Sequence, residues 1–565
     1  MQALPRDFRP CAKLSQPLHT TFSYRNYLPQ TFHQNRMHLN KWTTLFPIIQ
    51  DICNISGIPG VSLGVVENKK FHTASFGYAD ITSKTPCDSD TTYVLGSLSK
   101  GITAAIVASL HDDGTIPSWD TPLESLLPVF HREDIYGEIT LSDLLTHRTG
   151  LAALDSLWLS SNNDPYLPRS EAIRLLNHAP GVQPFRTQFI YNNFGYEILG
   201  QVIEKVTGSS FADVLRRRIL EPLKMRHTYY TGETRGHEAK PYAALENGSM
   251  ISVPPPLYGK DVLMGSAGGI RSSVNDLLIL YQAFMSAERE SANPQKPVIR
   301  DIQQLWRGHQ NIPHPSIREH SYGFGWARAQ LPAQLSRGPD PLRPIVGTGA
   351  SSQLAIFHGG AITGYNTYNV LLPEIESAVV VLTNSQSLNG GVELIGELLV
   401  EMLLNNSHNA ADYRNLAKLS VDATLQQEIS INQRLVAGRT VKKPSRPLDA
   451  YIGKYFNAAG NFFIQIRYTK DKKGLEVAYM GRNADAFRLF PYQRDSFFWT
   501  LTHDESAKLA REFVFPIEYH IIKFDSQNGS NVSCLWWKHD ADLPEPGEIF
   551  VQTNKGDHEH VREEL

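Results

Sequence analysis

The sequence predicts an α+β fold made of two units, and two patterns support this prediction. Residues 39–404 carry strand patterns at both ends and helical patterns between them, which indicates an antiparallel sheet flanked by helices plus a helical subdomain. Residues 448–548 carry short strands separated by turn residues, which is typical of a small antiparallel β-barrel. With 565 residues the chain is also too long for one hydrophobic core.

The first predicted elements are a helix and a β-hairpin. Apolar residues recur at helical spacing over 39–53, and Pro59 and Gly60 then break the helix. Two strand-like runs, 61–66 and 71–76, follow this break and are joined by a polar turn. We therefore expect a hairpin at the start of the sheet.

The middle of the first unit is mostly helical, and its end returns to strands. Helical patterns are found over 102–110, 142–145, 170–177, 194–207, 211–219 and 275–285. Strand patterns follow over 353–357, 365–372 and 378–383, and a last helical pattern covers 392–404. Because strands lie at both ends of the unit, we expect one sheet assembled from segments that are distant in the sequence.

The rest of the chain divides into a linker, the barrel and a tail. Residues 405–447 are polar, contain one helical stretch and end in a basic, Pro-containing segment, so they are interpreted as a linker. Within the barrel, strands are predicted over 461–468, 475–480, 486–492, 497–501, 513–524 and 532–537, with hairpin signals at 471–474 and 527–529. Residues 549–565 are predicted to form a charged tail.

Composition excludes several classes of partner. Apolar residues make up 41% of the chain and charged residues 20%, and the net charge is −3 with no basic patch, so no nucleic-acid partner is expected. No apolar stretch is long enough to span a membrane, and no membrane partner is expected. The sequence leaves the oligomeric state open.

The cysteines and the first residues bear on the compartment. Cys11, Cys53, Cys87 and Cys534 are widely scattered, which predicts free thiols in a reduced compartment and a cytoplasmic protein. Residues 1–38 are predicted to be an N-terminal arm; they have no secretory signal, and an organellar targeting role stays open.

Ser97 and Lys100 form the only Ser-x-x-Lys of the chain and are the strongest candidates for chemistry. They follow a β-branched run and the turn-former Gly96, and they precede the helical run at 102–110. Ser97 therefore lies in the first turn of a helix, with Lys100 on the same face. An amine in a dry pocket can help remove a proton from a hydroxyl. The simpler alternative is a helix-capping serine beside a solvated lysine.

Two further motifs can complete a site around this serine. Tyr191 and Asn193 form a Tyr-x-Asn just before a predicted helix, where the phenol can face a cleft and its pKa would fall near a lysine. His358 begins the only His-x-Gly of the chain, at the margin of a predicted strand where glycines let a ligand approach the backbone. Taken singly, each motif is most often a surface turn.

In order and approximate spacing, these three motifs resemble those of serine hydrolases that share the fold of penicillin-binding proteins and class C β-lactamases. That family carries Ser-x-x-Lys, then Tyr-x-Asn or Ser-x-Asn, then Lys, His or Trp followed by x-Gly. Other segments similar to the family are 57–62, 144–151, 266–270, 322–326 and 364–366. The resemblance covers residues 39–404, and the segment that begins at 451 resembles, more loosely, a lipocalin-like barrel appended to some members.

The resemblance implies roles for the matching residues. Ser97 would be the nucleophile that becomes acylated, and Lys100 and Tyr191 would activate it. Tyr191 would also protonate the leaving group, and Asn193 would orient Lys100 and the substrate. The implied reaction needs no metal and no organic cofactor.

The third motif implies an oxyanion hole and marks a departure from part of the family. The N–H groups of Ser97 and Ala361 would hold the oxyanion, on the strand that carries Gly359 and Gly360. His358 stands where penicillin-recognising members usually have lysine, and a neutral imidazole holds a carboxylate less well than an ammonium. A histidine at this position resembles the D-aminopeptidase-like and family VIII esterase-like branches of the family. This resemblance argues against β-lactamase or transpeptidase activity.

The sequence therefore predicts a serine hydrolase or acyltransferase that acts through an acyl-enzyme on an ester, thioester, lactone or small amide. Its expected partner is a small molecule or a short peptide. The alternatives are a transacylase for an alcohol or amine acceptor, a D-aminopeptidase-like peptidase, and a non-catalytic binding protein. The candidates for shaping the acyl pocket are Tyr322, Trp326 and the loop 154–166. Residues 330–352 are a candidate insertion near the cleft.

Overall fold

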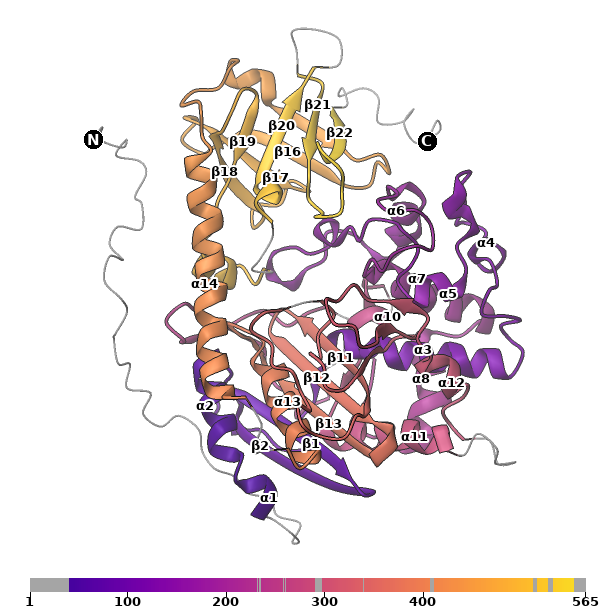
Figure 1. Cartoon of the computed structure of the whole chain (residues 1–565). Coiled ribbons are helices and arrows are strands. Elements are labelled where there is room, and N and C mark those ends of the chain that lie inside the picture. The colour runs from indigo at the N-terminus through magenta and orange to yellow at the C-terminus, as the bar shows by residue number, and fades with distance from the viewer. Residues whose placement is uncertain are drawn as a thin grey trace.

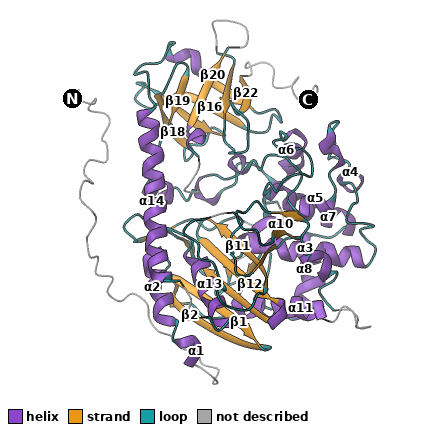
Figure 2. Cartoon of the chain, in the orientation of Figure 1, coloured by secondary structure: helices purple, strands orange, loops and turns teal. Residues whose placement is uncertain are grey.

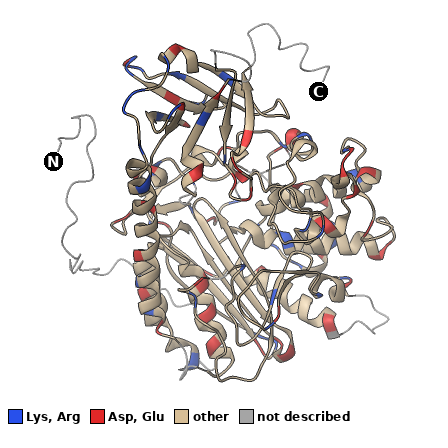
Figure 3. Ribbon diagram, turned by 45° about the horizontal axis from the view of Figure 1, so that its top comes forward, with Lys and Arg blue, Asp and Glu red and all other residues tan. Residues whose placement is uncertain are grey.

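The computed structural model describes residues 40–552 except 231, 233–234, 258, 260, 290–296, 339, 407–410, 512–515 and 527–531. The predicted N-terminal arm and Cys11 lie outside the described residues, as do most of the predicted charged tail and the hairpin signal at 527–529. Figure 1 shows two units, a sheet with its helices and a separate barrel, connected along one side by a long helix. Basic and acidic residues are interspersed over both units (Figure 3).

The sheet of the first unit is assembled from distant segments, as the sequence predicts. Its order is β3-β2-β1-β13-β12-β11-β10-β9-β8, and every neighbouring pair is antiparallel. The strands are β1 (Gly60–Glu67), β2 (Lys70–Asp80), β3 (Thr85–Pro86), β8 (Gln310–Asn311), β9 (His320–Tyr322), β10 (Ala327–Gln330), β11 (Leu354–Ile362), β12 (Tyr365–Leu372) and β13 (Ser377–Thr383). Strand β1 pairs with β13 in a register that places Val61 opposite Thr383.

Helices cover both faces of this sheet, so its central strands are apolar on both sides. Val379 and Val381 of β13 pack with the layer formed by α1 (Asn40–Thr43), α2 (Phe46–Ser56) and α13 (Gly391–Leu403). Val380 and Leu382 face the opposite layer, which contains α3 (Ser99–Asp112) and α11 (Val274–Arg289).

Helix α3 runs between the sheet and the helical subdomain and is buried along nearly its whole length. The subdomain contains α4 (Leu123–Leu126), α5 (Leu141–Leu145), α6 (Ala172–His178), α7 (Asn193–Thr207), α8 (Phe211–Leu215), α9 (Glu221–Leu223), α10 (Gly265–Gly268) and α12 (Ile302–Trp306). Two small sheets complete the unit, β4 (Tyr93–Val94) with β7 (Arg271–Ser272), and β14 (Ser385–Gln386) with β5 (Tyr242–Ala244) and β6 (Met250–Ser252).

The second unit is a closed antiparallel barrel of eight strands, which confirms the predicted fold class. Figure 2 shows its strands at the far end of the molecule from α11. They are β15 (Gly453–Phe456), β16 (Phe463–Tyr468), β17 (Leu475–Tyr479), β18 (Ala486–Pro491), β19 (Ser496–Phe498), β20 (Ile521–Asp525), β21 (Cys534–Trp537) and β22 (Glu548–Gln552). Aromatic rings such as Tyr479 and Trp537, whose centroids lie 4.8 Å apart, pack against each other.

The barrel differs from the sequence prediction at several places. Strand β15 forms where no strand is predicted. The barrel extends to Gln552 rather than 548, because β22 closes the barrel by pairing Gln552 with Tyr455 of β15. Of the strand predicted over 513–524, residues 513–515 lie outside the described residues, Ile517–His520 form a turn of 3-10 helix, and Ile521 begins β20. A short helix, α15 (His503–Lys508), stands between β19 and β20 where no element is predicted.

The predicted linker contains the long helix α14 (Tyr413–Ala437). Tyr413 at its start packs in the same apolar cluster as α2 and α13, and Leu435 near its end packs against Phe498 of the barrel. Helix α14 therefore contacts both units. Within the described residues, no helix combines the length and apolarity that crossing a lipid bilayer requires.

Candidate active site

Ser97 lies at the junction between β4 and α3, as the sequence predicts. A single turn of 3-10 helix (Gly96–Leu98) leads into α3, and Gly96 has a φ of +53°, which favours glycine. A Cβ atom at Gly96 would lie 2.7 Å from the Ala361 nitrogen on β11. Gly96 therefore supplies both the turn that presents Ser97 and the space that lets β11 approach it.

Lys100 is fully buried one turn after Ser97, and its Nζ donates three hydrogen bonds. It lies 3.0 Å from the Ser97 Oγ, 2.8 Å from the Asn193 Oδ1 and 3.0 Å from the Ala267 carbonyl oxygen. Burial, which penalises the ammonium, lowers the pKa of Lys100 despite the opposing influence of Tyr191. The amine is thus fixed in place and more easily deprotonated than a solvated lysine.

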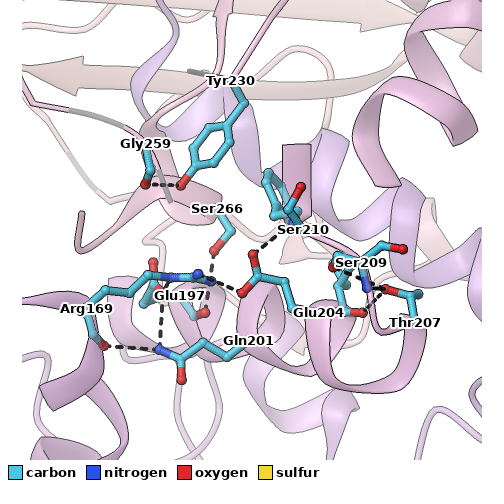
Figure 4. Close-up of polar contacts among 12 residues, drawn as sticks. Arg169, Glu197, Gln201, Glu204, Thr207, Ser209, Ser210, Tyr230, Gly259 and Ser266 are labelled. Atoms are coloured by element: carbon cyan, nitrogen blue, oxygen red, sulfur yellow. Dashed lines mark hydrogen bonds and ion pairs between the residues drawn. The ribbon is translucent and has the colours of Figure 1, made fainter. Parts of the chain in front are cut away.

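The two helices that hold Lys100 are themselves fixed to each other. Asn193 begins α7 and Ala267 lies on α10, and these helices approach so closely that a Cβ at Gly200 would meet Ser266. The Ser266 hydroxyl donates to the Tyr196 carbonyl at 2.9 Å. Behind this contact, a single arginine bridges two acids of α7 (Figure 4), with ion pairs of 2.6 and 2.7 Å that join Arg169 to Glu197 and Glu204.

Tyr191 precedes α7 and donates from its hydroxyl to the Ser97 Oγ at 2.8 Å. Burial alone would raise the pKa of Tyr191, but the charges of Lys100 and Arg337 outweigh burial and lower it. The Arg337 guanidinium lies 3.8 Å from the centre of the phenol ring, and the centre of the His147 ring lies 4.3 Å from it. The phenol therefore packs against both side chains, with its oxygen on Ser97.

Strand β11 lies beside Ser97 because of one of its two adjacent glycines. A Cβ at Gly360 would meet the Leu95 carbonyl oxygen at 2.1 Å, so only glycine fits this approach. The next residue, Ala361, is exposed and lines the same cavity as Ser97, where the predicted oxyanion hole requires its N–H. Gly359 lies on the opposite face of the strand from Gly360, and its nearest neighbours are Tyr368 and Glu393.

His358 is buried next to this group and does not contact Ser97 in the described part of the chain. Its Nδ1 donates to the Gly359 carbonyl at 2.7 Å, so its Nε2 accepts from the Tyr322 hydroxyl at 2.8 Å. Burial lowers the pKa of His358 well below its usual value, and the ring is neutral. The centre of the His358 ring lies 6.2 Å from the centre of the Tyr191 ring, so the imidazole is a neighbour of the phenol.

The side chains of Ser97, Tyr191 and Asn193 open into a cavity of about 310 Å³. Part of its wall is apolar and is formed by Trp158, Leu159, Pro256, Leu257, Leu263 and Met264. Among the described residues, the charged ones that line it are Asp155 and Arg337. A cavity of this size suits a small molecule or a short peptide segment.

Sequence reasoning found the polar centre and missed part of the wall. The 154–166 loop lines the cavity as expected, and the 330–352 segment contributes Arg337, which no motif singles out. Tyr322 and Trp326 do not line it, because Tyr322 binds His358 and Trp326 packs against Phe284.

The geometry brings a hydroxyl, an amine and a phenol into one hydrogen-bonded group at the mouth of the cavity. Removing the Ser97 proton toward Lys100 or Tyr191 leaves an alkoxide at a helix N-terminus, where the backbone favours negative charge. The arrangement can therefore generate a nucleophile at Ser97.

Known proteins resemble the chain in sequence and fold. The Unguisins hydrolase ungD of Aspergillus violaceofuscus is 27% identical over 434 residues, covering 71% of this chain and 72% of that protein. The Beta-lactamase of Escherichia coli is 26% identical over 357 residues, covering 60% of this chain and 87% of that protein. The D-aminopeptidase of Cereibacter sphaeroides is 24% identical over 336 residues, covering 58% of this chain and 57% of that protein.

Among solved structures, the octameric penicillin-binding protein homologue from Pyrococcus abyssi shares the fold. Its TM-score is 0.53 at 22% sequence identity, and the match covers 82% of this chain and 94% of that one. The Beta-lactamase family model matches residues 48–401, which is well over half of the chain. The chain is therefore a member of the Beta-lactamase family and a serine hydrolase of the β-lactamase-like kind.

Proposed function

We propose that this protein hydrolyses an ester or a small amide through an acyl-enzyme formed on Ser97. The observation that carries the proposal is the position of the Ser97 Oγ, 3.0 Å from the Lys100 Nζ and 2.8 Å from the Tyr191 hydroxyl. Relatives named as hydrolases support hydrolysis in preference to acyl transfer.

In the proposed first step, the Ser97 oxygen attacks the acyl carbon and its proton passes to the Lys100–Tyr191 couple. Lys100 and Tyr191 act as one acid–base unit, because the ammonium of Lys100 and the phenolate of Tyr191 stabilise each other. Tyr191 then delivers the proton to the leaving group as the bond to the acyl carbon breaks. Water then attacks the acyl carbon and gives a proton to the couple, and the couple returns that proton to the Ser97 oxygen as its bond to the acyl carbon breaks, which releases the free acid.

The backbone N–H groups of Ser97 and Ala361 are proposed to hold the oxyanion. Support comes from the approach of β11 to the Ser97 turn and from the place of both residues on the cavity wall. One such donor contributes about 2.7–4 kcal/mol to the transition state. His358 is proposed to support Tyr191 through packing, since its ring nitrogens are occupied by Gly359 and Tyr322.

The proposed substrate is a small molecule or a short peptide with an apolar group next to the acyl carbon. The apolar part of the wall, from Trp158 to Met264, supports this choice. We also place the enzyme in the cytoplasm, because Cys53, Cys87 and Cys534 are free thiols, which suits a reduced compartment.

Intact-mass spectrometry tests the proposal. The full chain is exposed to a panel of activated esters, thioesters, β-lactams and small amides, and we expect an acyl adduct that Ser97→Ala lacks. Ser99→Ala is the matched control. Ser99 is close to Ser97 in the sequence, but it is buried and does not line the cavity, and its hydroxyl accepts a hydrogen bond from the Ile270 N–H. An adduct that persists in Ser97→Ala, or no adduct with any reagent, contradicts the proposal.

A second arm separates hydrolysis from transfer. The acylated enzyme is mixed with alcohol and amine acceptors, and the released products are identified. We expect the free acid to remain the main product. Dominant transfer to an acceptor would instead support the transacylase alternative.

A further inference from the structure

The barrel contacts the 154–166 loop, which lines the active-site cavity, although none of the barrel's described residues lines the cavity itself. The loop supplies Asp155, Trp158, Leu159, Ser160, Asn163 and Pro165 to that wall. The same loop forms hydrogen bonds to residues of the barrel at both of its ends.

The first end of the loop is held on both sides of Asp155. The Leu154 N–H donates to the Asp540 Oδ2 at 3.1 Å, and the Ser156 hydroxyl donates to the His539 Nδ1 at 2.6 Å. The opposite ring nitrogen of His539 donates to Glu548 at 2.7 Å, which fixes the tautomer that accepts from Ser156.

The backbone at Leu154 is strained, and the hydrogen bonds from the barrel help to hold it in that conformation. Leu154 has a φ of +56°, in the left-handed region that a leucine rarely adopts. Such conformations persist only where surrounding structure enforces them, and they gather at functional sites. Leu154, the residue held in this conformation, directly precedes Asp155.

The second end of the loop is held by buried charges of the barrel. The Asp485 Oδ1 accepts from the Ser161 backbone at 2.9 Å and from the Ser161 hydroxyl at 2.7 Å. Arg511 pairs with Asp485 and also donates to the Tyr166 hydroxyl at 3.3 Å. The loop is therefore attached to the barrel at both of its ends.

Asp155 connects this attachment to Lys100. Its two carboxylate oxygens accept from the Asn193 Nδ2 at 3.0 and 3.2 Å, and one of them also accepts from the Trp158 indole at 2.8 Å. With its NH₂ on Asp155, the Asn193 amide turns its oxygen toward the Lys100 Nζ at 2.8 Å. A rotated amide would present NH₂ to an amine that already donates to the Ala267 carbonyl.

We propose that the barrel helps to position the catalytic amine: its residues His539 and Asp540 hold the residues on either side of Asp155, Asp155 sets the orientation of the Asn193 amide, and that amide fixes Lys100. Asp155, His539 and Asp540 are positioning residues, since they act through Asn193. The inference rests on the proposed function, in which Lys100 activates Ser97.

The test compares three sites in the full-length chain. Asp155→Ala removes the acceptor for Asn193, and Asp155→Asn keeps one acceptor oxygen. Asp540→Ala removes the barrel contact to Leu154. Asp542→Ala is the matched control, because it lies in the same barrel segment and its carboxylate has no hydrogen-bond partner among the described residues. Thermal unfolding of every variant is recorded to confirm folding.

The first readout is the rate constant for Ser97 acylation at saturating activated ester. Misplacement of a reacting group costs up to about 100-fold, so we expect a loss of about 10- to 100-fold for Asp155→Ala. Asp155→Asn is expected to recover part of that loss. Asp540→Ala is expected to lose up to about tenfold, the equivalent of one hydrogen bond, and Asp542→Ala is expected to match the wild type.

The second readout is a neutron crystal structure of Asp155→Ala, which distinguishes the amide nitrogen of Asn193 from its oxygen and does not depend on activity. We expect the Asn193 amide to rotate and its oxygen to leave Lys100. An unchanged amide, acylation of Asp155→Ala at the wild-type rate, or equal losses in Asp540→Ala and Asp542→Ala would overturn the inference. If wild-type Ser97 is not acylated at all, the proposed function fails, while the crystal structure still decides whether Asp155 positions Asn193.

Discussion

Replacing Gly96 with alanine tests whether the approach of β11 to the Ser97 turn is needed for chemistry. The new Cβ would lie 2.7 Å from the Ala361 nitrogen and 3.1 Å from its oxygen, closer than packed atoms tolerate. Gly96 also has a φ of +53°, which costs an alanine about 1–2 kcal/mol. Because backbone atoms cause the overlap, β11 must shift away from Ser97.

The two penalties can be separated with a second glycine. Gly114, just after α3, has a φ of +80°, and no atom of the described residues lies within 4 Å of the position that a Cβ would take there. Gly114→Ala therefore carries the conformational cost alone, whereas overpacking adds about 1–3 kcal/mol at Gly96. Displacing the oxyanion donor on Ala361 should also slow acylation by about 10²–10³-fold.

The assay measures acylation by a chromogenic ester and the midpoint of urea unfolding for each variant. We expect Gly114→Ala to acylate like the wild type while losing stability. We expect Gly96→Ala to lose more stability and most of its acylation rate. If Gly96→Ala acylates as fast as Gly114→Ala, the position of β11 is irrelevant to catalysis and the oxyanion assignment is wrong.

Three further predictions concern the phenol and two buried acids. Tyr191→Phe should slow Ser97 acylation by about 10²–10⁴-fold; in the wild type, the lowered pKa of Tyr191 moves the rise of rate with pH to values below the usual pKa of a phenol, which a pH–rate profile will show. Arg169→Met leaves the fully buried Glu197 unpaired and should destabilise the first unit by about 3–5 kcal/mol, whereas Arg169→Met combined with Glu197→Leu should recover much of that loss in urea unfolding. Burial raises the pKa of Glu397 from 4.5 to about 8, so its contribution to stability is present below pH 4.5 and is lost as pH rises toward 8; Glu397→Gln should flatten the fall in thermal stability over this range, and an unchanged slope would show that the acid is solvated.

The elements of the fold could be predicted from the sequence where the spacing of apolar residues shows a clear strand or helix pattern. The alternation of fully buried strands with helices of clear apolar period located β1, β12, β13, α7 and α11 within a few residues. The strands that close the barrel, β15 and β22, were missed because each is short and only half-buried, so neither shows a strong apolar pattern. Their pairing is decided by closure of the barrel and not by local preference.

The same distinction applies to the active site. Ser97, Lys100, Tyr191 and Asn193 lie at positions that motif spacing identifies, and the structure brings all four together. Asp155 could not be identified in this way, because its importance comes from hydrogen bonds to Asn193 and from residues of the barrel hundreds of positions away.

The pairing of β1 with β13 has a consequence for synthesis of the protein. The hairpin formed by β1 and β2 emerges early from the ribosome, yet its partner strand starts at Ser377. Until then one edge of the hairpin has unpaired backbone groups and apolar side chains, and long-range pairing of this kind is slow. Chains that terminate before β13 should therefore aggregate or require chaperones, and a circular permutant that begins near β12 should fold with less assistance.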